Sequence, residues 1–299
     1  MKHLKFTFIA IAFAVILSFF TIDAIEKGEK PLVIVVPSYN NAQWYQLNLD
    51  SILAQNYTNY RVIYINDCSK DDTGKLVEEY LKKVNVDHRR IDFDDSKAQS
   101  INEKTKLFSA QINNESHFFT LINNINRSGA LSNLYRAILS SDDNAIIVTV
   151  DGDDWLIHPE VFSQLNKIYS SKSVWLTHGT LKEHPYGNVS WCEPVPKHII
   201  WENKFRSFKC PSHLRTFYAW LFKSINLKDL LYEEDFFAMA WDMAIMYPMI
   251  EMAGERHAFI KEPNYVYNME NQINDNKVNA ELQRKLDLYI RNMKPYKRL

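Results

Sequence analysis

The sequence predicts an α/β fold of the Rossmann-like type, in which helices flank a mixed, mainly parallel sheet. Three short apolar runs rich in β-branched residues carry this prediction, at 32–36, 61–65 and 145–150. Such runs, without alternation of polar residues, are typical of strands buried on both faces. Apolar residues at helical spacing follow the first two runs, which gives the strand–helix–strand–helix order of βαβ units.

The elements of the first half follow one another closely, except for one interruption. Residues 85–120 are polar and poorly periodic, so we expect a surface insertion there, which could include one helix. The other predicted helices are 47–53, 72–83, 129–139 and 159–169, and a further strand is predicted at 174–177.

The second half has a weaker pattern. Residues 179–212 are rich in proline and lack periodicity, which predicts a long loop region. A helix broken near Pro248 is expected at 236–252, and an amphipathic helix at 278–293. We therefore expect a core at 31–180, and a loop- and helix-rich region of the same domain at 181–299.

Composition limits the classes of function. Hydrophobic residues make up 46% of the 299 residues and charged residues 24%, which suits a globular core. The formal net charge of −1 lacks the basic footprint of a nucleic-acid-binding protein, so we expect no nucleic-acid partner. The three cysteines have no zinc-site spacing.

The N-terminal 24 residues differ from the rest of the chain. Lys2, His3 and Lys5 precede an apolar run at 6–20, which is of borderline length for a membrane span. The same pattern also suits a signal peptide with Ala24 as its cleavage point. We expect residues 1–24 to be an uncleaved membrane anchor, the alternative being a secreted, periplasmic or lumenal protein after signal cleavage.

Three carboxylates lie together at the end of the third predicted strand. Asp151, Asp153 and Asp154 follow the run at 145–150 directly. They repel one another unless a cation or water lies among them. Carboxylate oxygens suit Mg²⁺ or Mn²⁺, and open α/β sheets bind ligands beyond the carboxyl ends of their strands. The alternative is a solvated acidic turn.

The two earlier strands also end in residues suited to ligand binding. Tyr39, in the segment 37–40, offers an aromatic face on which a base can stack. Asp67 offers a carboxylate that can accept the imide N–H of uracil. The alternative for both segments is helix capping after a strand.

These segments together resemble the family 2 glycosyltransferases of the GT-A fold. The resemblance covers residues 31–180, and the order and spacing of four motifs carry it. The motifs are VIVVPSYN at 33–40, SILAQ at 51–55, INDCSKDDT at 65–73 and DGDD at 151–154. The resemblance implies transfer of a sugar from a nucleotide-diphosphate donor, most simply a UDP-sugar, to an acceptor hydroxyl, with inversion and metal assistance. Residues 181–299 would then bind the acceptor.

The resemblance also implies roles for individual residues. Arg127, in a segment that resembles the stretch before the family's middle helix, would face the base or the diphosphate. Asp153 and Asp154 would hold the metal, Mn²⁺ or Mg²⁺. The nucleotide-sugar site would comprise Pro37, Ser38, Tyr39, Asn40, Asp67, Arg127, Asp151 and Asp153.

On the acceptor side the sequence departs from the family pattern. The Glu-Asp pair that usually supplies the catalytic base is absent, and Asp242 is the nearest candidate, with Glu251 as the alternative. Trp241 could serve as a sugar platform, while His213 and Arg215 could reach the diphosphate or the acceptor.

Some relatives also place a metal-binding histidine near the C-terminus. The matching segment 265–271 contains no histidine. An asparagine, or water and phosphate, would have to complete the metal site.

Two other functions remain open at this stage. A sugar-nucleotide nucleotidyltransferase would share the fold, but the turn after the first strand lacks the expected glycines. The absent Glu-Asp pair leaves room for a non-catalytic, membrane-tethered protein that binds sugars or nucleotides. The acceptor, whether glycan, lipid or protein, also stays open.

Overall fold

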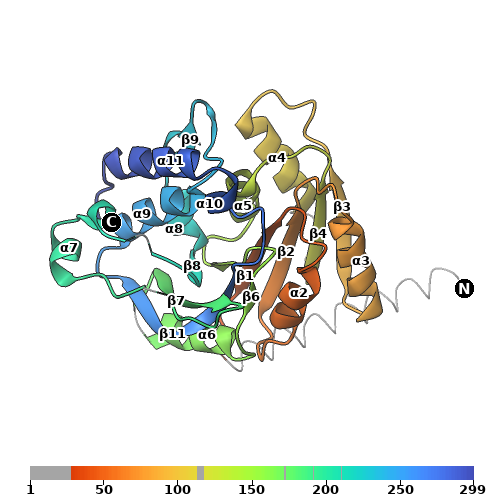
Figure 1. The fold of residues 1–299 in the computed structure, drawn as a ribbon, viewed down its shortest axis with the longest axis horizontal. Coiled ribbons are helices and arrows are strands. Elements are labelled where there is room, and N and C mark those ends of the chain that lie inside the picture. Colours follow the sequence, from red (N-terminus) through yellow and green to blue (C-terminus); the bar gives the residue numbers. More distant parts are fainter. Residues whose placement is uncertain (1–27, 113–117, 172, 191, 210) are drawn as a thin grey trace, which may run out of the picture.

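The computed structural model describes residues 28–112, 118–171, 173–190, 192–209 and 211–299. The predicted anchor or signal at 1–24 lies outside these ranges. Among the helices within them, none combines the length and the apolar character that a bilayer span requires. The described chain folds into one large sheet covered on both faces by helices (Figure 1).

The large sheet has nine strands in the order β3-β4-β2-β1-β5-β8-β7-β11-β6. The first five are parallel, β8 runs antiparallel between β5 and β7, and β11 is parallel to β7 but antiparallel to β6. The strands are β1 (Leu32–Ser38), β2 (Tyr60–Asn66), β3 (His88–Phe93), β4 (Phe119–Asn124), β5 (Ile146–Thr149), β6 (Trp155–Leu156), β7 (Leu176–His184), β8 (Arg215–Tyr218) and β11 (His257–Asn268). A separate hairpin pairs β9 (Leu231–Tyr232) with β10 (Asp235–Phe236).

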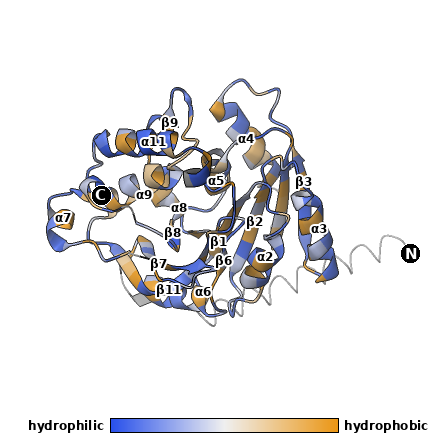
Figure 2. Ribbon diagram, viewed as in Figure 1, coloured by the Kyte–Doolittle hydropathy of each residue, from blue (hydrophilic) through white to orange (hydrophobic). Residues whose placement is uncertain are grey.

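Helices cover the two faces of the sheet because successive side chains of each strand point to opposite faces. In β1, Val33 and Val35 pack into one hydrophobic core, whereas Ile34 and Val36 pack into the other. The first core takes apolar residues from α4, α5, α8, α9 and α11, and the second from α2, α3 and α6. Figure 2 shows the hydrophobic residues of the central strands between these layers. The helices are α2 (Tyr45–Leu53), α3 (Thr73–Lys83), α4 (Ile101–Ile112), α5 (Ala130–Leu139), α6 (Val161–Ser171), α7 (Lys197–Trp201), α8 (Ala219–Lys223), α9 (Trp241–Ala253), α10 (Asp275–Val278) and α11 (Ala280–Asn292).

The α/β fold class and the three principal strands are confirmed. The predicted runs are β1, β2 and β5, which are neighbours in the sheet. The prediction for residues 85–120 is wrong, because this segment contributes β3 and β4 as well as α4. β3 is the edge strand, and only Ile91 and Phe93 of its residues are buried. Its sequence, HRRIDF, can therefore contain charged residues, and these gave no strand signal in the sequence.

The second half contains more regular structure than the sequence predicts. β7 extends to His184 and α7 follows, so residues 179–212 are not one long loop. The helix expected at 236–252 begins five residues later, at Trp241, and Pro248 lies inside it. β11 was not predicted from the sequence, because polar residues interrupt it where its register with β7 shifts, between Ile260 and Tyr265.

Candidate functional site

A cavity of about 890 Å³ opens at the carboxyl ends of β1, β2 and β5. Its walls are the loops after these strands, the beginning of α5, the segment that leads into α9 and the segment that follows β11. Open α/β sheets bind ligands at this edge, because the loops there are free to vary while the strands hold them in place.

The cavity brings together all but one of the site residues predicted from the sequence. The exception is Glu251. The predicted residues that line the cavity are Pro37, Ser38, Tyr39, Asn40, Asp67, Arg127, Asp151, Asp153, Asp154, His213, Arg215, Trp241 and Asp242.

The acidic turn after β5 is packed tightly against the end of β1. A Cβ atom added at Gly152 would lie 2.5 Å from Ser38 Oγ and 2.6 Å from Ser38 Cβ, so the turn requires glycine at this position. The buried Asn48 side chain of α2 donates hydrogen bonds to the backbone oxygens of Asp151 (2.9 Å) and Asp154 (2.7 Å). The turn is therefore fixed before any ligand binds.

Asp154 is buried, and hydrogen bonds join its carboxylate to the last residues of β11. Its two carboxylate oxygens accept hydrogen bonds from the Tyr265 hydroxyl and the Asn268 N–H, both at 2.7 Å. Burial, followed by the charges of Asp153 and Asp151, raises the pKa of Asp154 well above its ordinary value. The arrangement therefore concentrates negative charge that a bound cation would relieve.

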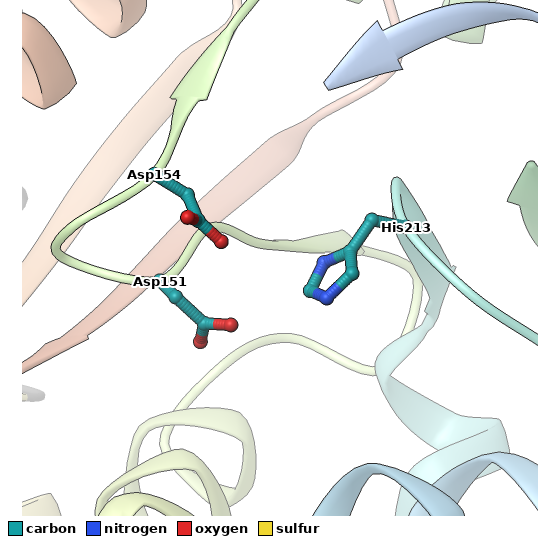
Figure 3. Close-up of side chains that lie close together, drawn as sticks. All are labelled: Asp151, Asp154 and His213. Carbon is teal, nitrogen blue, oxygen red and sulfur yellow. The ribbon is translucent and has the colours of Figure 1, made fainter. Parts of the chain in front are cut away.

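His213 faces two of these carboxylates from the opposite wall (Figure 3). Asp151, Asp154 and His213 each offer a ligand atom, and these atoms lie within 4.8 Å of one another. Burial and the neighbouring Arg215 charge hold the pKa of His213 well below its usual range, so the ring is neutral and offers a nitrogen lone pair. Two carboxylates and one imidazole suit a divalent cation such as Mn²⁺.

Asp153 lies beside this group but has a different partner. Its carboxylate accepts a hydrogen bond from the Asn271 side chain at 2.7 Å. The structure thus groups Asp151, rather than the predicted Asp153, with Asp154, and adds His213, which the sequence analysis assigned to the diphosphate or the acceptor. Asn271 lies in the late segment without histidine, and it contacts the acidic turn through Asp153.

Tyr39 and Arg127 form the end of the cavity expected to hold the base. The Arg127 guanidinium lies 3.9 Å from the centre of the Tyr39 ring, which is a cation–π contact. Lys70, which the sequence analysis did not single out although it lies in the INDCSKDDT motif, lines the cavity nearby.

Asp67 fixes the beginning of α5. Its carboxylate accepts hydrogen bonds from the backbone N–H groups of Ser128 (2.9 Å) and Gly129 (2.8 Å) and from the Asn124 side chain (2.8 Å). These bonds use much of the accepting capacity of one carboxylate. Asp67 therefore fixes the loop that leads into α5, and it is not a helix cap, because α5 has no side-chain cap and the bonded N–H groups belong to Ser128 and Gly129, which precede the helix.

On the acceptor side, an ion pair lies in the cavity wall at the beginning of α9. Arg215 Nη2 donates to Asp242 Oδ2 at 2.8 Å, and the guanidinium carbon of Arg215 lies 5.6 Å from the Trp241 ring. The Asp242 side chain is 30% exposed, whereas that of Arg215 is 6% exposed. The hydrogen bond from Arg215 thus fixes Asp242 Oδ2, while part of the Asp242 side chain stays exposed at the cavity.

Glu251 does not fit the role of base. It lies outside the cavity and is fully buried. Its carboxylate accepts hydrogen bonds from Arg206 Nε (2.6 Å) and Nη2 (3.0 Å) and from the Tyr296 N–H (2.9 Å). A substrate hydroxyl cannot reach a carboxylate enclosed in this way, so the placement argues for a structural role.

Comparison with known proteins adds sequence evidence for the first part of the chain. Residues 33–103 match the model of glycosyl transferase family 2. An uncharacterized glycosyltransferase of Rickettsia prowazekii is 44% identical over 55 residues, which is 18% of this chain and 17% of that protein. The chain thus matches less than a fifth of the length of this relative.

Two solved structures share the fold over most of the chain. TarS of Staphylococcus aureus in complex with UDP has a TM-score of 0.53 at 15% identity, covering 80% of this chain and 60% of that chain. The mannosyltransferase PcManGT of Pyrobaculum calidifontis, in complex with GDP-Man and Mn²⁺, has a TM-score of 0.54 at 16% identity, covering 90% and 66%. At these identities the likeness concerns the fold, which is that of GT-A glycosyltransferases. Residues 33–103 thus match the family 2 glycosyltransferases in sequence, and the described chain shares the fold of GT-A glycosyltransferases.

Proposed function

We propose that this protein transfers a sugar from a nucleoside-diphosphate donor, with UDP as the nucleotide, to an acceptor hydroxyl, with inversion at the anomeric carbon. The observation that carries the proposal is the single cavity that joins a candidate base platform, a cation site and an open carboxylate. The structures of TarS with UDP and PcManGT with GDP-Man and Mn²⁺ support a nucleotide-sugar donor in this fold.

The two ends of the cavity suggest how the donor lies. Tyr39 and Arg127 offer flat surfaces for the base, and the acidic turn lies where a diphosphate would follow. Asp151, Asp154 and His213 would hold a divalent cation, Mn²⁺ or Mg²⁺. Such a cation supplies Lewis acidity that stabilises negative charge on a diphosphate.

Asp242 is the residue that fits the role of general base. Its exposed oxygen would take the proton of the acceptor hydroxyl as that oxygen attacks the anomeric carbon and the bond to the diphosphate breaks. Attack on the face opposite the leaving group inverts the configuration. Arg215 holds Asp242 in place, and Trp241 offers an apolar surface for a sugar ring.

We also propose that residues 1–24 anchor the protein in a membrane. Support comes from the apolar run at 6–20 behind Lys2 and Lys5. Cleavage of the same segment as a signal peptide would instead release the protein, and N-terminal sequencing of the mature chain distinguishes the two.

The donor site is tested by calorimetric titration of UDP into the protein with and without Mn²⁺. The variants are Asp151→Ala and, as a matched control, Asp143→Ala, which removes an exposed aspartate that pairs with Lys223 at the opposite end of β5 from the turn. We expect ion-dependent UDP binding in the wild type and the control, and loss of the ion dependence in Asp151→Ala.

Two other results of the titration would change the proposed function. Binding of GDP in place of UDP would change the nucleotide and keep the reaction class. Absence of binding for every nucleoside diphosphate would reject the proposal in favour of a non-catalytic protein.

A further inference from the structure

A second cavity, of about 560 Å³, lies next to the donor cavity. Its walls come from the beginning of α4, the beginning of α5 and the β9–β10 hairpin. Figure 1 shows α4 and β9 at the same edge of the molecule. The volume falls within the range of small-molecule sites, about 300–1,000 Å³.

The charges around this cavity balance. Lys104 and Arg136 both contact the Asp95 carboxylate, at 3.4 Å and 3.1 Å. The remaining cation of the wall, Arg127, is accompanied by the exposed carboxylates of Glu234 and Asp235. Without an excess of positive charge the cavity does not select an anion, so a neutral polar ligand fits better.

The uncharged part of the lining suits hydroxyl groups. Gln99, Ser100, Asn102 and Ser132 supply amides and hydroxyls, which both donate and accept hydrogen bonds. Phe236, packed against Tyr135 with ring centroids 5.2 Å apart, supplies an apolar wall. Hydrogen-bonding side chains beside an aromatic ring match a sugar, which has polar hydroxyls and an apolar C–H face.

The two cavities share walls. Arg127 lines both of them. Glu234–Phe236 line the second cavity, and Ala238–Asp242 line the first. Phe236 and Ala238 are two residues apart, a separation of roughly 7 Å at most along an extended chain. A ligand in the second cavity can therefore extend along this segment towards Asp242.

We propose that the second cavity is an acceptor subsite for a neutral saccharide, and that the acceptor has at least one sugar unit beyond the one that receives the transferred sugar. The acceptor role of this subsite rests on the proposed function. Binding of a saccharide in the second cavity does not depend on it. It narrows the acceptor class to glycans, free or attached to a carrier.

To test this proposal, the full chain is incubated with UDP and Mn²⁺ on an array of defined mono- and oligosaccharides, both neutral and charged. Its retention on each saccharide is measured. Asn102→Trp blocks the cavity from an exposed helix position, and Asn102→Ala removes one amide with little effect on folding. Lys106→Trp, an exposed residue of the same helix outside the cavity lining, is the matched control.

We expect retention of neutral oligosaccharides of two or more units by the wild type and by Lys106→Trp. Asn102→Trp should lose this binding at least tenfold, and Asn102→Ala should lose it to a smaller extent. UDP binding measured by calorimetry on the same preparations should be equal in all four proteins.

Three results overturn the inference: no saccharide retained although UDP binds, retention confined to charged glycans, or retention unchanged by both Asn102 variants. If the proposed function is wrong, the wild type does not bind UDP, so this outcome can be distinguished from the three above. Saccharide retention that depends on Asn102 would then still support a saccharide-binding site in the second cavity.

Discussion

Two carboxylates of α9 each pair with an arginine from another part of the chain, and the two pairs have the same chemistry and different surroundings. Arg215–Asp242 lies at the first turn of the helix, in the wall of the 890 Å³ cavity, and Arg206–Glu251 lies near its end, in the core. Asp242 has a 30% exposed side chain, while Glu251 is fully enclosed and accepts three hydrogen bonds. Both carboxylates were candidates for the base, and only their surroundings separate them.

The comparison shows that a catalytic base requires a carboxylate that a substrate can reach. A carboxylate whose oxygens are all engaged contributes to stability, because removing either member of the pair leaves a buried charge without compensation. A carboxylate held on one side and open on the other can take a proton from a substrate. The first two of the four predictions below test this difference, and the other two extend it to the acidic turn and to a buried histidine, in order of decreasing expected effect.

The largest effect is expected from Asp242→Asn. The amide still accepts the hydrogen bond from Arg215 but cannot act as a base, so the rate of sugar transfer should fall by about 10²–10⁴-fold. UDP affinity should stay close to wild type, and the melting temperature should fall less than in Arg206→Ala, because the amide keeps a hydrogen bond to the buried Arg215. Steady-state donor consumption in the presence of acceptor measures the rate, and Asp143→Asn is the control. A rate within a factor of three of wild type would exclude Asp242 as the base.

Arg206→Ala should instead act on stability. It leaves the buried Glu251 carboxylate unpaired, at a cost of about 3–5 kcal/mol in the free energy of unfolding. Urea denaturation followed by circular dichroism measures the loss. The double variant Arg206→Met/Glu251→Leu should recover part of it, because no buried charge remains. Reduced donor binding by folded Arg206→Ala would instead mean that this pair does influence the site.

A third prediction concerns the acidic turn, which belongs to the cavity but depends on close packing. Gly152→Ala places a Cβ atom against Ser38, so the turn or β1 must shift. We expect a loss of about 1–3 kcal/mol in the free energy of unfolding, as for other overpacked sites, together with weaker ion-dependent UDP binding. If both quantities stay at wild-type values, the tight contact between the turn and β1 does not hold in solution.

The smallest effect concerns His178, a buried histidine of β7 that does not line the 890 Å³ cavity. Burial, and then the neighbouring His257, lowers the pKa of His178 from 6.5 to about 3. Because the unfolded chain binds the proton more readily, His178 contributes stability above pH 6.5 that is lost as the pH falls from 6.5 towards 3, by up to about 1.4 kcal/mol per pH unit.

The variant His178→Phe should therefore show a shallower decline of unfolding free energy between pH 7 and pH 5, measured by urea denaturation at each pH. His198→Phe, at an exposed position, is the control and should keep the wild-type slope. Equal slopes in all three proteins would mean that His178 is protonated equally in the folded and unfolded chains.

The sequence by itself determined the sheet's centre and located most of the candidate site residues that line the 890 Å³ cavity. The runs that form β1, β2 and β5 are apolar on both faces, so their burial is visible without structure. Asp151, Asp153 and Asp154 follow β5 directly, and Tyr39 follows β1. Residues adjacent to a strand end are placed by that strand, which is why local motifs located them.

Only the tertiary structure decided the remaining positions. His213 joins Asp151 and Asp154 although about sixty residues separate them in the sequence, and no spacing rule predicts such a contact. The choice between Asp242 and Glu251 depends on what packs around each side chain, which α9 alone does not reveal. The polar strands β3 and β11 form because neighbouring strands satisfy their backbone groups. Hydrophobic pattern specifies burial along the chain, whereas proximity between distant segments arises only when the whole sheet is assembled.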